Sequence, residues 1–478
     1  MKIKKILLCN LPLEGELKYY ISPPYFLKEA VSYPPLGLLY LAAQIKDAEV
    51  KLLDTSCNIK LSIEETIRKI LTEQPDIVGI TAYSIRAYAL KTICARLSKE
   101  CRDYIRIVVG GNHVSLYPIE TLKYPGVNYV LKGEGDYTFP QLLKAIESGE
   151  DESSLSRIKG LYYFDKTGRI KGNADTEPIT DLDALPFPRR SLLNPSLYST
   201  LAQDTAAMTS LVSSRGCSFK CIFCDVPLKK INFRSAENVV DEMAEIVSLG
   251  INEISFFDDC FNVDPERVTK ICRLIIERKL NVRWSCRLRP VPFTEEMASL
   301  MARSGCNRLH FGVESANDDV LRYARKGISY KQSKQTLDIC RKYNLKSLIY
   351  LMFGFPQEDR KTLRESEKII LNELRPDYIF PSILFPLAGT VYYQELLKSK
   401  RLKCDFWAQY VENPTPDFKV PCFRTPEEDA MLIGFVDNLN KRFYLSPRFI
   451  CKNISRVIRN RTLLRSIRIG RELLFRGH

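Results

Sequence analysis

The chain has 478 residues, 45% of them hydrophobic, and a formal net charge of +14. This length exceeds a typical single domain and predicts two to four domains. No apolar run approaches the roughly 18–20 residues of a membrane-spanning helix, and no N-terminal signal is visible, so a cytoplasmic protein is expected. The 15 cysteines form no disulfide-framework spacing, which favours free or metal-bound thiols in a reducing compartment.

Strands and helices alternate over residues 1–150. The predicted strands are Lys4–Asn10, Glu49–Asp54, Asp76–Ala82, Ile105–Gly110 and Val127–Lys132, and the predicted helices are Leu36–Lys46, Ile63–Glu73, Tyr88–Lys99 and Tyr137–Glu147. Repeated units with strongly apolar strands predict an α/β domain with a doubly wound, Rossmann-like parallel sheet. Such sheets bind ligands beyond the carboxyl ends of their strands, where glycines let a ligand approach the backbone. The candidate ligand-binding residues at these ends are Thr81, Ser84, Gly110, Gly111, His113, Gly133 and Glu134.

A hairpin and a linker are predicted over residues 151–205. Ile158–Gly172 has a hairpin pattern with Asp165–Gly168 as its turn. Pro178–Pro195 is rich in Pro and Asp, which is typical of a linker.

Strand–helix units resume over residues 206–400. The predicted strands are Thr209–Ser214, Glu253–Asp258, Arg283–Arg287, Arg308–Glu314, Ser347–Phe353 and Tyr378–Leu384. Helical patterns such as Ala236–Ser248 and Glu266–Arg278 follow them. Six units predict a (β/α)6 partial barrel, with its chemistry at the carboxyl ends of the strands.

Three cysteines directly follow the first barrel strand. Cys217, Cys221 and Cys224 have the spacing CxxxCxxC, preceded by a glycine. Thiolates hold iron–sulfur clusters, and three of them leave one iron of a four-iron cluster without a protein ligand. An open metal site can bind and activate a substrate. A structural zinc is the alternative, but zinc needs four ligands, and no His or fourth Cys lies within 35 residues of the loop.

This loop, with Phe223 directly before its last cysteine, resembles the signature of radical S-adenosylmethionine (SAM) enzymes. The resemblance implies a 4Fe-4S cluster on the three cysteines and SAM bound at the open iron. It also implies reductive cleavage of SAM to methionine and a 5′-deoxyadenosyl radical, and the partial barrel is the form these domains share. An electron donor such as a flavodoxin or ferredoxin is then an expected partner.

The same resemblance gives roles to residues at the barrel strand ends. The candidate SAM contacts are Asp258, Asp259, Arg287, Glu314, Ser315, Gly354 and Pro356. Asp258 or Asp259 would bind the SAM amino group, whereas Asp264 fits better as the N-cap of the next helix. Arg287 suits the SAM carboxylate, although a structural salt bridge is equally open.

Four further phrases resemble the cobalamin-binding group of radical SAM enzymes. They are Tyr33–Gly37, Gly110–His113, Gly133–Asp136 and Arg234–Asp241. This resemblance spans nearly all of residues 1–400 and implies cobalamin between the two α/β domains. It implies hydrogen abstraction and then methyl transfer to an unactivated carbon, or ring formation or oxidation. The Asp-x-His-x-x-Gly motif is missing, so a cobalt ligand from His is not expected, and His113 would line the nucleotide-tail pocket or serve only as a hydrogen-bonded loop residue.

Two alternatives remain open at this point. A transfer-RNA methylthiotransferase would hold a second cluster, for which Cys9, Cys57 and Cys94 are loosely spaced. Their usual sequence context is missing, and an RNA-binding barrel does not follow, so nucleic acid is an unexpected partner. A non-catalytic cobalamin sensor is the alternative from another class, but a sensor needs no reducible cluster.

The last region, residues 401–478, is strongly basic. From Lys441 to His478 there are eleven Lys or Arg and one acid, Glu472, so this tail contributes +10 of the +14. Apolar residues recur at near-helical period between Ile450 and Leu474, with basic residues between them. Such a helix favours peripheral membrane contact at the inner face and a lipid-like small-molecule substrate. A helix docked on the barrel is equally open, and phosphate binding is a rival.

Overall fold

The structure is a computed structural model that describes residues 2–15, 32–57, 60–101, 104–198 and 207–459, the last six of these by their backbone alone. The described residues form two compact units. We call residues 2–15, 32–198 and 397–421 the N-terminal unit, and residues 207–396 and 422–459 the barrel unit. Within the described residues, no helix is long and apolar enough to cross a membrane.

The N-terminal unit is built on a seven-stranded sheet with the order β2-β1-β3-β4-β5-β6-β7. Its strands are β1 (Lys5–Asn10), β2 (Glu49–Leu53), β3 (Ile77–Thr81), β4 (Arg106–Gly110), β5 (Val127–Leu131), β6 (Leu161–Phe164) and β7 (Ile170–Gly172). Strands β1 to β5 pair in parallel, which confirms the predicted doubly wound sheet. The predicted hairpin pairs antiparallel with β5, so it extends this sheet.

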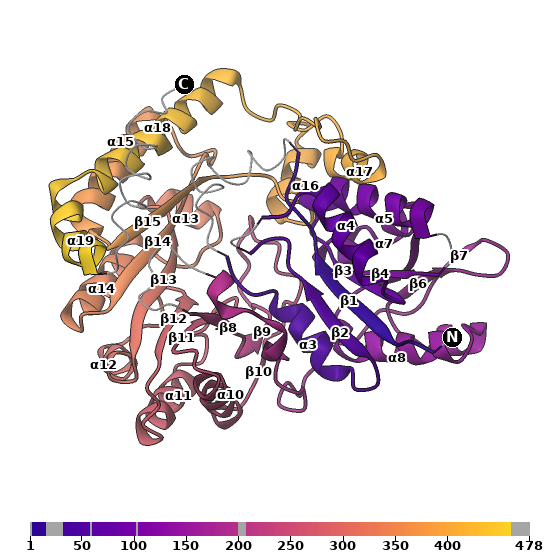
Figure 1. The fold of residues 1–478 in the computed structure, drawn as a ribbon. Coiled ribbons are helices and arrows are strands. Elements are labelled where there is room, and N and C mark those ends of the chain that lie inside the picture. Colours follow the sequence, from indigo (N-terminus) through magenta and orange to yellow (C-terminus); the bar gives the residue numbers. More distant parts are fainter. Residues whose placement is uncertain (1, 16–31, 58–59, 102–103, 199–206, 460–478) are drawn as a thin grey trace. The chain divides into compact units, whose positions relative to one another are not determined.

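Helices cover both faces of this sheet, as Figure 1 shows. Helices α3 (Leu36–Gln44) and α8 (Gly135–Glu147) pack on one face, against alternate strand residues such as Ile6 and Leu8. The opposite face, which includes Leu7, is covered by α4 (Ile63–Glu73), α5 (Ala87–Cys101) and α7 (Pro118–Leu122). Short helices α6 (Asn112–Leu116) and α9 (Glu152–Leu155) complete the segment. The strand period of two thus sets which side chains form each core.

The segment 397–421 belongs to the N-terminal unit and not to a separate C-terminal region. Its helix α17 (Phe406–Glu412) lies on α5 and α7. The Tyr410 hydroxyl accepts a hydrogen bond from the backbone of Tyr88, and the Tyr124 hydroxyl donates to the carbonyl of Val411. The sequence pattern alone did not indicate this return.

The barrel unit contains a six-stranded sheet in the order β15-β14-β13-β12-β11-β8. Its strands are β8 (Thr209–Leu211), β11 (Glu253–Phe256), β12 (Arg283–Leu288), β13 (Cys306–Glu314), β14 (Lys346–Phe353) and β15 (Tyr378–Ile383). Every neighbouring pair is parallel, and β8 and β15 lie at the two ends of the order. This open series confirms the predicted partial barrel.

One face of the barrel sheet is apolar and covered by helices (Figure 1). The covering helices are α10 (Ala236–Ser248), α11 (Pro265–Glu277), α12 (Glu295–Arg303), α14 (Tyr330–Lys342), α15 (Arg360–Ile369) and α18 (Pro426–Tyr444). Along β13, Leu309, Phe311 and Val313 belong to this core. The residues that alternate with them, such as Arg308 and His310, point to the opposite face, where these polar side chains lie.

Side-chain caps begin the barrel helices. Asp264 accepts a hydrogen bond from Arg267 N and is the N-cap of α11, as predicted. Helices α13 (Asp318–Tyr323), α16 (Val391–Lys398) and α19 (Pro447–Arg459) complete the unit.

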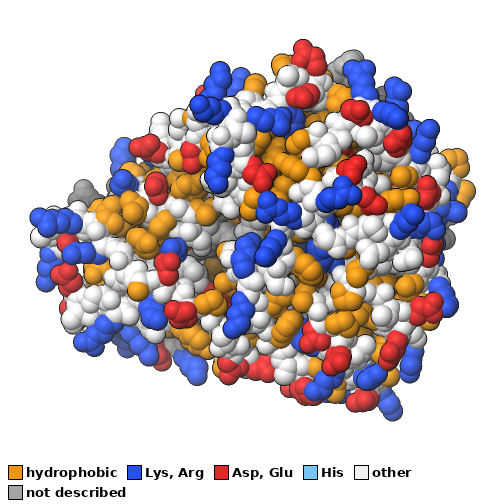
Figure 2. All heavy atoms as spheres, turned by 180° about the vertical axis from the view of Figure 1, so that it is seen from behind, with side chains coloured by type: hydrophobic (Ala, Val, Ile, Leu, Met, Phe, Trp, Pro, Cys, Tyr) orange, Lys and Arg blue, Asp and Glu red, His pale blue; other side chains and the backbone are white. Residues whose placement is uncertain are grey.

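On the face drawn in Figure 2, basic and acidic side chains are interspersed. The basic tail therefore accounts for most of the charge excess, and its residues 460–478 lie outside the described part of the chain.

Candidate cluster and cofactor site

The three cysteines lie on a loop closed by a short hairpin. Strand β9 (Ser214–Arg215) enters the loop, β10 (Asn232–Phe233) leaves it, and the two pair antiparallel. Cys217 N donates to the carbonyl of Leu228 at 2.9 Å. Gly216 has φ +95°, and a Cβ there would lie 2.3 Å from the carbonyl oxygen of Lys230. Only glycine fits this position, so the glycine before the first cysteine is a steric requirement.

Asp258 fixes the stem of this loop from the end of β11. Its carboxylate accepts hydrogen bonds from Ser213 N, at 2.7 Å, and from the hydroxyls of Ser213 and Ser214. The side chain is 1% exposed. These three bonds end the first barrel strand at residue 211, where a strand to residue 214 was predicted, and turn the chain toward the cysteines.

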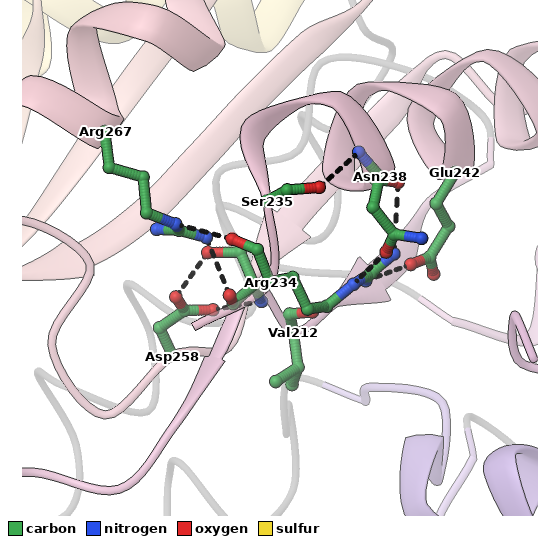
Figure 3. A network of polar contacts seen from close by, with 8 residues as sticks. Val212, Arg234, Ser235, Asn238, Glu242, Asp258 and Arg267 are labelled. Carbon is green, nitrogen blue, oxygen red and sulfur yellow. Dashed lines mark hydrogen bonds and ion pairs between the residues drawn. The ribbon is translucent and has the colours of Figure 1, made fainter. Parts of the chain in front are cut away.

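Two buried arginines hold the same stem, Arg234 from the turn before α10 and Arg267 from α11 (Figure 3). Arg234 donates to the carbonyl of Val212 at 2.9 Å and forms a buried ion pair with Glu242. Arg267 donates to the carbonyl of Ser213 at 2.6 Å and to that of Arg234 at 2.9 Å. The motif Arg234–Asp241 thus has a structural task, which is to anchor the cysteine loop on the helices behind it.

The thiols of Cys217, Cys221 and Cys224 are half-buried. Burial raises the pKa of Cys217, and it raises the pKa of Cys224 to about 11. In the part of the chain that the structure describes, no three His, Cys, Asp or Glu side chains converge on one metal ion. A four-iron cluster takes one cysteine per iron, so three thiolates suit three of its irons. The donor set therefore fits an iron–sulfur cluster.

Two cations and several aromatic rings surround the loop. Arg289 Cζ lies 3.8 Å from the ring centroid of Phe219, and Arg289 Nη1 donates to Cys221 Sγ at 3.7 Å. Lys326 Nζ lies 6.0 Å from the ring centroid of Phe223. Phe223 also makes an edge contact with Phe355, with 6.3 Å between ring centroids. Sequence reasoning missed Arg289 and Lys326, because neither lies in a motif that names a cluster.

The predicted residues at the ends of the second and third barrel strands interact with each other, and Asp259 also contacts the loop. Asp259 accepts a hydrogen bond from Gly216 N at 3.2 Å, and burial raises the pKa of its carboxyl. Arg287 stacks over Phe257, with its Cζ 3.5 Å from the ring centroid. The charge of Arg287 opposes the rise in the Asp259 pKa, so the two groups interact.

The fourth strand ends in a buried ion pair. Glu314 Oε1 lies 2.9 Å from Lys326 Nζ, and both side chains are buried. Glu314 has φ +66°, an uncommon conformation for a residue other than glycine. Ser315 is fully buried, and its hydroxyl accepts a hydrogen bond from Asn317 N. A Cβ on Gly312 would meet Glu314 and Lys326 below 3 Å, so this pair lies against bare backbone.

The fifth strand ends in a turn closed by Glu358. Its carboxylate accepts hydrogen bonds from Gly354 N at 2.6 Å and from Phe355 N at 3.0 Å. Burial raises the pKa of Glu358 to about 7. Gly354 has φ +99°, with the Arg424 guanidinium against it, and Pro356 is exposed. Sequence reasoning named Gly354 and Pro356 in this turn and missed Glu358.

In the N-terminal unit, the predicted ligand-binding residues gather at the ends of β3 and β4. Gly111 has φ +95°, and a Cβ there would lie 2.7 Å from Thr81 Oγ1; Gly110 precedes it at the end of β4. His113 is fully buried, with Nδ1 3.1 Å from Ser84 Oγ. Burial lowers the pKa of His113 to about 4, so its ring is neutral at pH 7. Within the described residues its buried Nε2 has no hydrogen-bond partner.

Gly133 and Glu134 lie just after β5. A Cβ on Gly133, which has φ +90°, would lie 2.0 Å from Thr176 Oγ1. Glu134 accepts a hydrogen bond from Ile179 N at 2.7 Å. Gly111 and Gly133 thus allow the chain to pack tightly on itself after β4 and β5, at the sheet edge where doubly wound folds bind their ligands.

The cysteines of the second-cluster alternative lie in the interior of the same unit. Cys9 and Cys94 are fully buried, and Cys57 is 6% exposed. Cys9 Sγ donates to its neighbour's carbonyl, Asn10 O, and burial raises the pKa of Cys94 to about 12. These thiols pack as core side chains, which favours a cobalamin-type domain over a second cluster.

Comparison with known proteins identifies both halves of the chain. A family described as the radical SAM superfamily matches residues 211–369, and a B12 binding domain matches residues 26–143. An uncharacterized methyltransferase of Pyrococcus horikoshii is 30% identical over 462 residues, which cover 95% of each chain. The anaerobic magnesium-protoporphyrin IX monomethyl ester cyclase of Rubrivivax gelatinosus is 26% identical and covers 90% of this chain and 78% of its own.

Solved structures show the same fold. The radical SAM methyltransferase TsrM from Kitasatospora setae, solved with cobalamin and a [4Fe-4S] cluster, has a TM-score of 0.67 at 20% identity and covers 92% of this chain and 88% of its own. The cobalamin-dependent SAM radical enzyme OxsB has a TM-score of 0.61 at 20% identity, covering 85% of this chain and 56% of its own. With the near full-length relative, these matches show that the chain belongs to the cobalamin-binding radical SAM enzymes, whose cofactors are a 4Fe-4S cluster, SAM and cobalamin.

Proposed function

We propose that this chain is a cobalamin-dependent radical SAM methyltransferase that acts on a small molecule. The cysteine loop carries the proposal, because its three half-buried thiols sit on a stem that Asp258 and two buried arginines fix at the carboxyl edge of a partial barrel. The relative that matches 95% of the chain is named a methyltransferase, which supports methyl transfer as the outcome.

When bound, the cluster and SAM supply a 5′-deoxyadenosyl radical that removes hydrogen from an unactivated carbon, and cobalamin supplies the methyl group. Cys217, Cys221 and Cys224 would hold the cluster as thiolates, one on each of three irons. The hairpin stem holds these thiols in place against the barrel. An external one-electron donor is required, for which we propose a flavodoxin or ferredoxin.

The strand-end residues of the barrel would hold the polar groups of SAM. Asp259 accepts one hydrogen bond from the loop backbone, which leaves it capacity to accept from an ammonium group. Arg287 offers a planar guanidinium suited to the SAM carboxylate. The ribose is assigned to the strand end of Glu314 and Ser315, and the adenine to the turn of Gly354 and Pro356, where Pro356 is exposed.

The N-terminal unit would bind cobalamin along its glycine-lined edge. Gly110 would let the ligand approach the backbone at the end of β4, and Gly111 and Gly133 shape the adjoining turns. Thr81, Ser84 and Glu134 offer oxygen atoms nearby. His113 is neutral and buried, so it supports the loop from within and is a poor candidate for a cobalt ligand.

Ring formation is the second candidate reaction. The cyclase of Rubrivivax gelatinosus aligns with 90% of this chain, and cyclisation uses the same hydrogen abstraction. The two outcomes differ in the fate of the SAM methyl group, which enters the product only in methyl transfer.

The test uses anaerobically reconstituted protein, SAM labelled with deuterium in its methyl group, and a low-potential reductant. We expect release of 5′-deoxyadenosine and transfer of label to protein-bound cobalamin. C221A should release no 5′-deoxyadenosine, because it loses one of three cluster ligands. Wild-type protein that cleaves SAM but never transfers label would favour ring formation, and cleavage by C221A would overturn the proposal.

We also propose that the basic tail brings the enzyme to anionic membrane surfaces, where a lipid-like substrate would be found. Most of the amphipathic pattern lies outside the described residues. The described start of α19 supports the proposal in part: Ile450 is 47% exposed beside Arg448 and Lys452, although Lys452 also reaches Asp377. Vesicles with and without phosphatidylserine test it. We expect the protein to co-sediment only with vesicles that contain phosphatidylserine. Equal amounts of sedimented protein with and without vesicles would contradict the proposal.

A further inference from the structure

Arg289 lies directly after β12 and is held in one position by its backbone. Its N–H donates to Asn262 Oδ1 at 3.0 Å, and its carbonyl accepts from Asn262 Nδ2 at 3.0 Å. Asn262 is fully buried and also donates to the carbonyl of Pro292. A residue fixed on both sides of its Cα directs its side chain into a defined place.

The guanidinium of Arg289 ends against the cysteine loop. Nη1 donates to Cys221 Sγ at 3.7 Å, and Nη2 donates to the carbonyl of Lys326. The plane lies over Phe219, with 3.8 Å from Cζ to the ring centroid. Nε is buried and has no hydrogen-bond partner within the described residues. The side chain is 6% exposed, so solvent screens its charge weakly.

The charge of Arg289 is not neutralised by a carboxylate in the described part of the chain. Lys326, whose ammonium group also lies near the loop, is paired with Glu314 at 2.9 Å. Arg289 instead contacts a carbonyl, a ring and a thiol. It therefore places a net positive charge, with an N–H donor, on the sulfur of one cluster ligand.

We propose that Arg289 is a positioning residue that sets the reduction potential of the cluster through Cys221. The inference rests on the cluster assigned to this loop in the proposed function. Reduction adds one electron from the external donor, and no proton moves and no bond forms or breaks, because an arginine stays protonated. A buried cation and a hydrogen bond to a ligand sulfur both stabilise the more negative, reduced cluster. Arg289 thereby makes the cluster easier to reduce.

Three variants of the full-length chain test the role of Arg289. R289Q keeps a donor but removes the charge. R289K keeps the charge but lacks the planar fork that reaches both the thiol and the Lys326 carbonyl. R283Q removes a charge from the exposed start of the same strand and is the matched control. Each is reconstituted anaerobically, its iron is counted, and its cluster is titrated electrochemically while electron paramagnetic resonance records the reduced form.

We expect R289Q to keep its iron and to be reduced at least tenfold less favourably than wild type, which is 59 mV for a one-electron couple. R289K should shift in the same direction by less, and R283Q should match wild type. An iron-replete R289Q with the wild-type potential would overturn the proposal. If R289Q binds no iron, R289K decides: a lowered potential supports the proposal, and an unchanged one overturns it. Failure of the cluster assignment itself would appear earlier, as wild-type protein without iron.

Discussion

Asp258 and Asp259 are adjacent, but their surroundings give them different tasks. Asp258 is 1% exposed and accepts three hydrogen bonds from Ser213 and Ser214. Its carboxylate oxygens are therefore used to hold the stem of the cysteine loop. Asp259 accepts one, from Gly216 N. The sequence left open which of the two would contact the SAM amino group. The geometry favours Asp259 for that role and Asp258 for holding the loop.

Replacing each aspartate by asparagine should separate these tasks. D258N replaces one carboxylate oxygen by an NH2 group, which cannot accept the hydrogen bonds of Ser213 and Ser214. The variant should therefore have a free energy of unfolding lower by about 1–3 kcal/mol and bind less iron. D259N should keep both but bind SAM more weakly. Thermal unfolding, iron content and calorimetric titration with SAM measure these effects. Normal iron in D258N together with lost iron in D259N would reverse the assignment.

Glu358 should make stability depend on pH near neutrality. Burial raises its pKa to about 7 in the folded chain, from 4.5 for the ordinary group. Between these values the folded state binds a proton that the unfolded state does not, so stability from this group rises as pH falls from 8 to 5. The full difference is on the order of 3 kcal/mol. Urea unfolding at both pH values should show this gain in wild type and not in E358Q; equal gains in both proteins would refute it.

The difference between Arg287 and Arg289 illustrates what sequence can supply at single residues. Both follow the pattern of a strand end, and the predicted strand ended at Arg287. The structure continues β12 to Leu288, so Arg289 is the residue that turns into the cysteine loop. Because β12 is one residue longer than predicted, Arg289 and not Arg287 contacts the thiol of Cys221. That length depends on pairing with β13, which lies far along the chain.

At the scale of elements, the hairpin of β9 and β10 shapes the cluster loop. Gly216 enters it with φ +95°, and a Cβ would lie 2.3 Å from a backbone oxygen, that of Lys230. Gly250 also has a positive φ, +78°, but a Cβ there meets nothing within 4 Å. Both glycines have a positive φ, which would strain any other residue. Only Gly216 also lacks the room for a side chain.

G216A and G250A form a matched pair that tests the hairpin. G250A should cost about 1–3 kcal/mol of stability through φ alone and keep full iron binding. G216A should cost more and lose most of its iron, because the backbone must move apart at the loop entrance. Chemical denaturation and iron analysis give both values. The hairpin would not control the loop if G216A bound iron as well as G250A does.

Periodicity was sufficient to predict most strands and helices of both sheets, since each has one apolar stripe or a continuous apolar run. It was insufficient where distant groups end an element. The first barrel strand ends at Leu211 because Asp258, in the loop after β11, accepts the hydrogen bonds of Ser213. The hairpin after residue 157 joins the sheet through pairing with β5, which composition does not reveal.

At the scale of the molecule, the cluster and cobalamin assignments belong to units with separate cores. One core lies between the barrel sheet and its helices, and two others lie on the two faces of the N-terminal sheet. Because each unit buries its own apolar residues, damage at the cysteine loop should leave the N-terminal unit folded.

C221A should therefore lose iron and keep cobalamin. We expect cobalt binding close to that of wild type, and a visible spectrum of bound cobalamin without the absorption of the cluster. Circular dichroism controls for folding. If a folded C221A lost cobalt together with iron, the two sites would depend on each other and the assignment to separate units would fail.

The measurement that tests the central claim most directly is the iron and cobalt content of wild-type protein, reconstituted anaerobically with iron, sulfide and hydroxocobalamin. The account predicts roughly four irons, all on one cluster, and about one tightly held cobalt per chain. Roughly eight irons without cobalt would instead place a second cluster in the N-terminal unit and contradict a cobalamin-dependent enzyme.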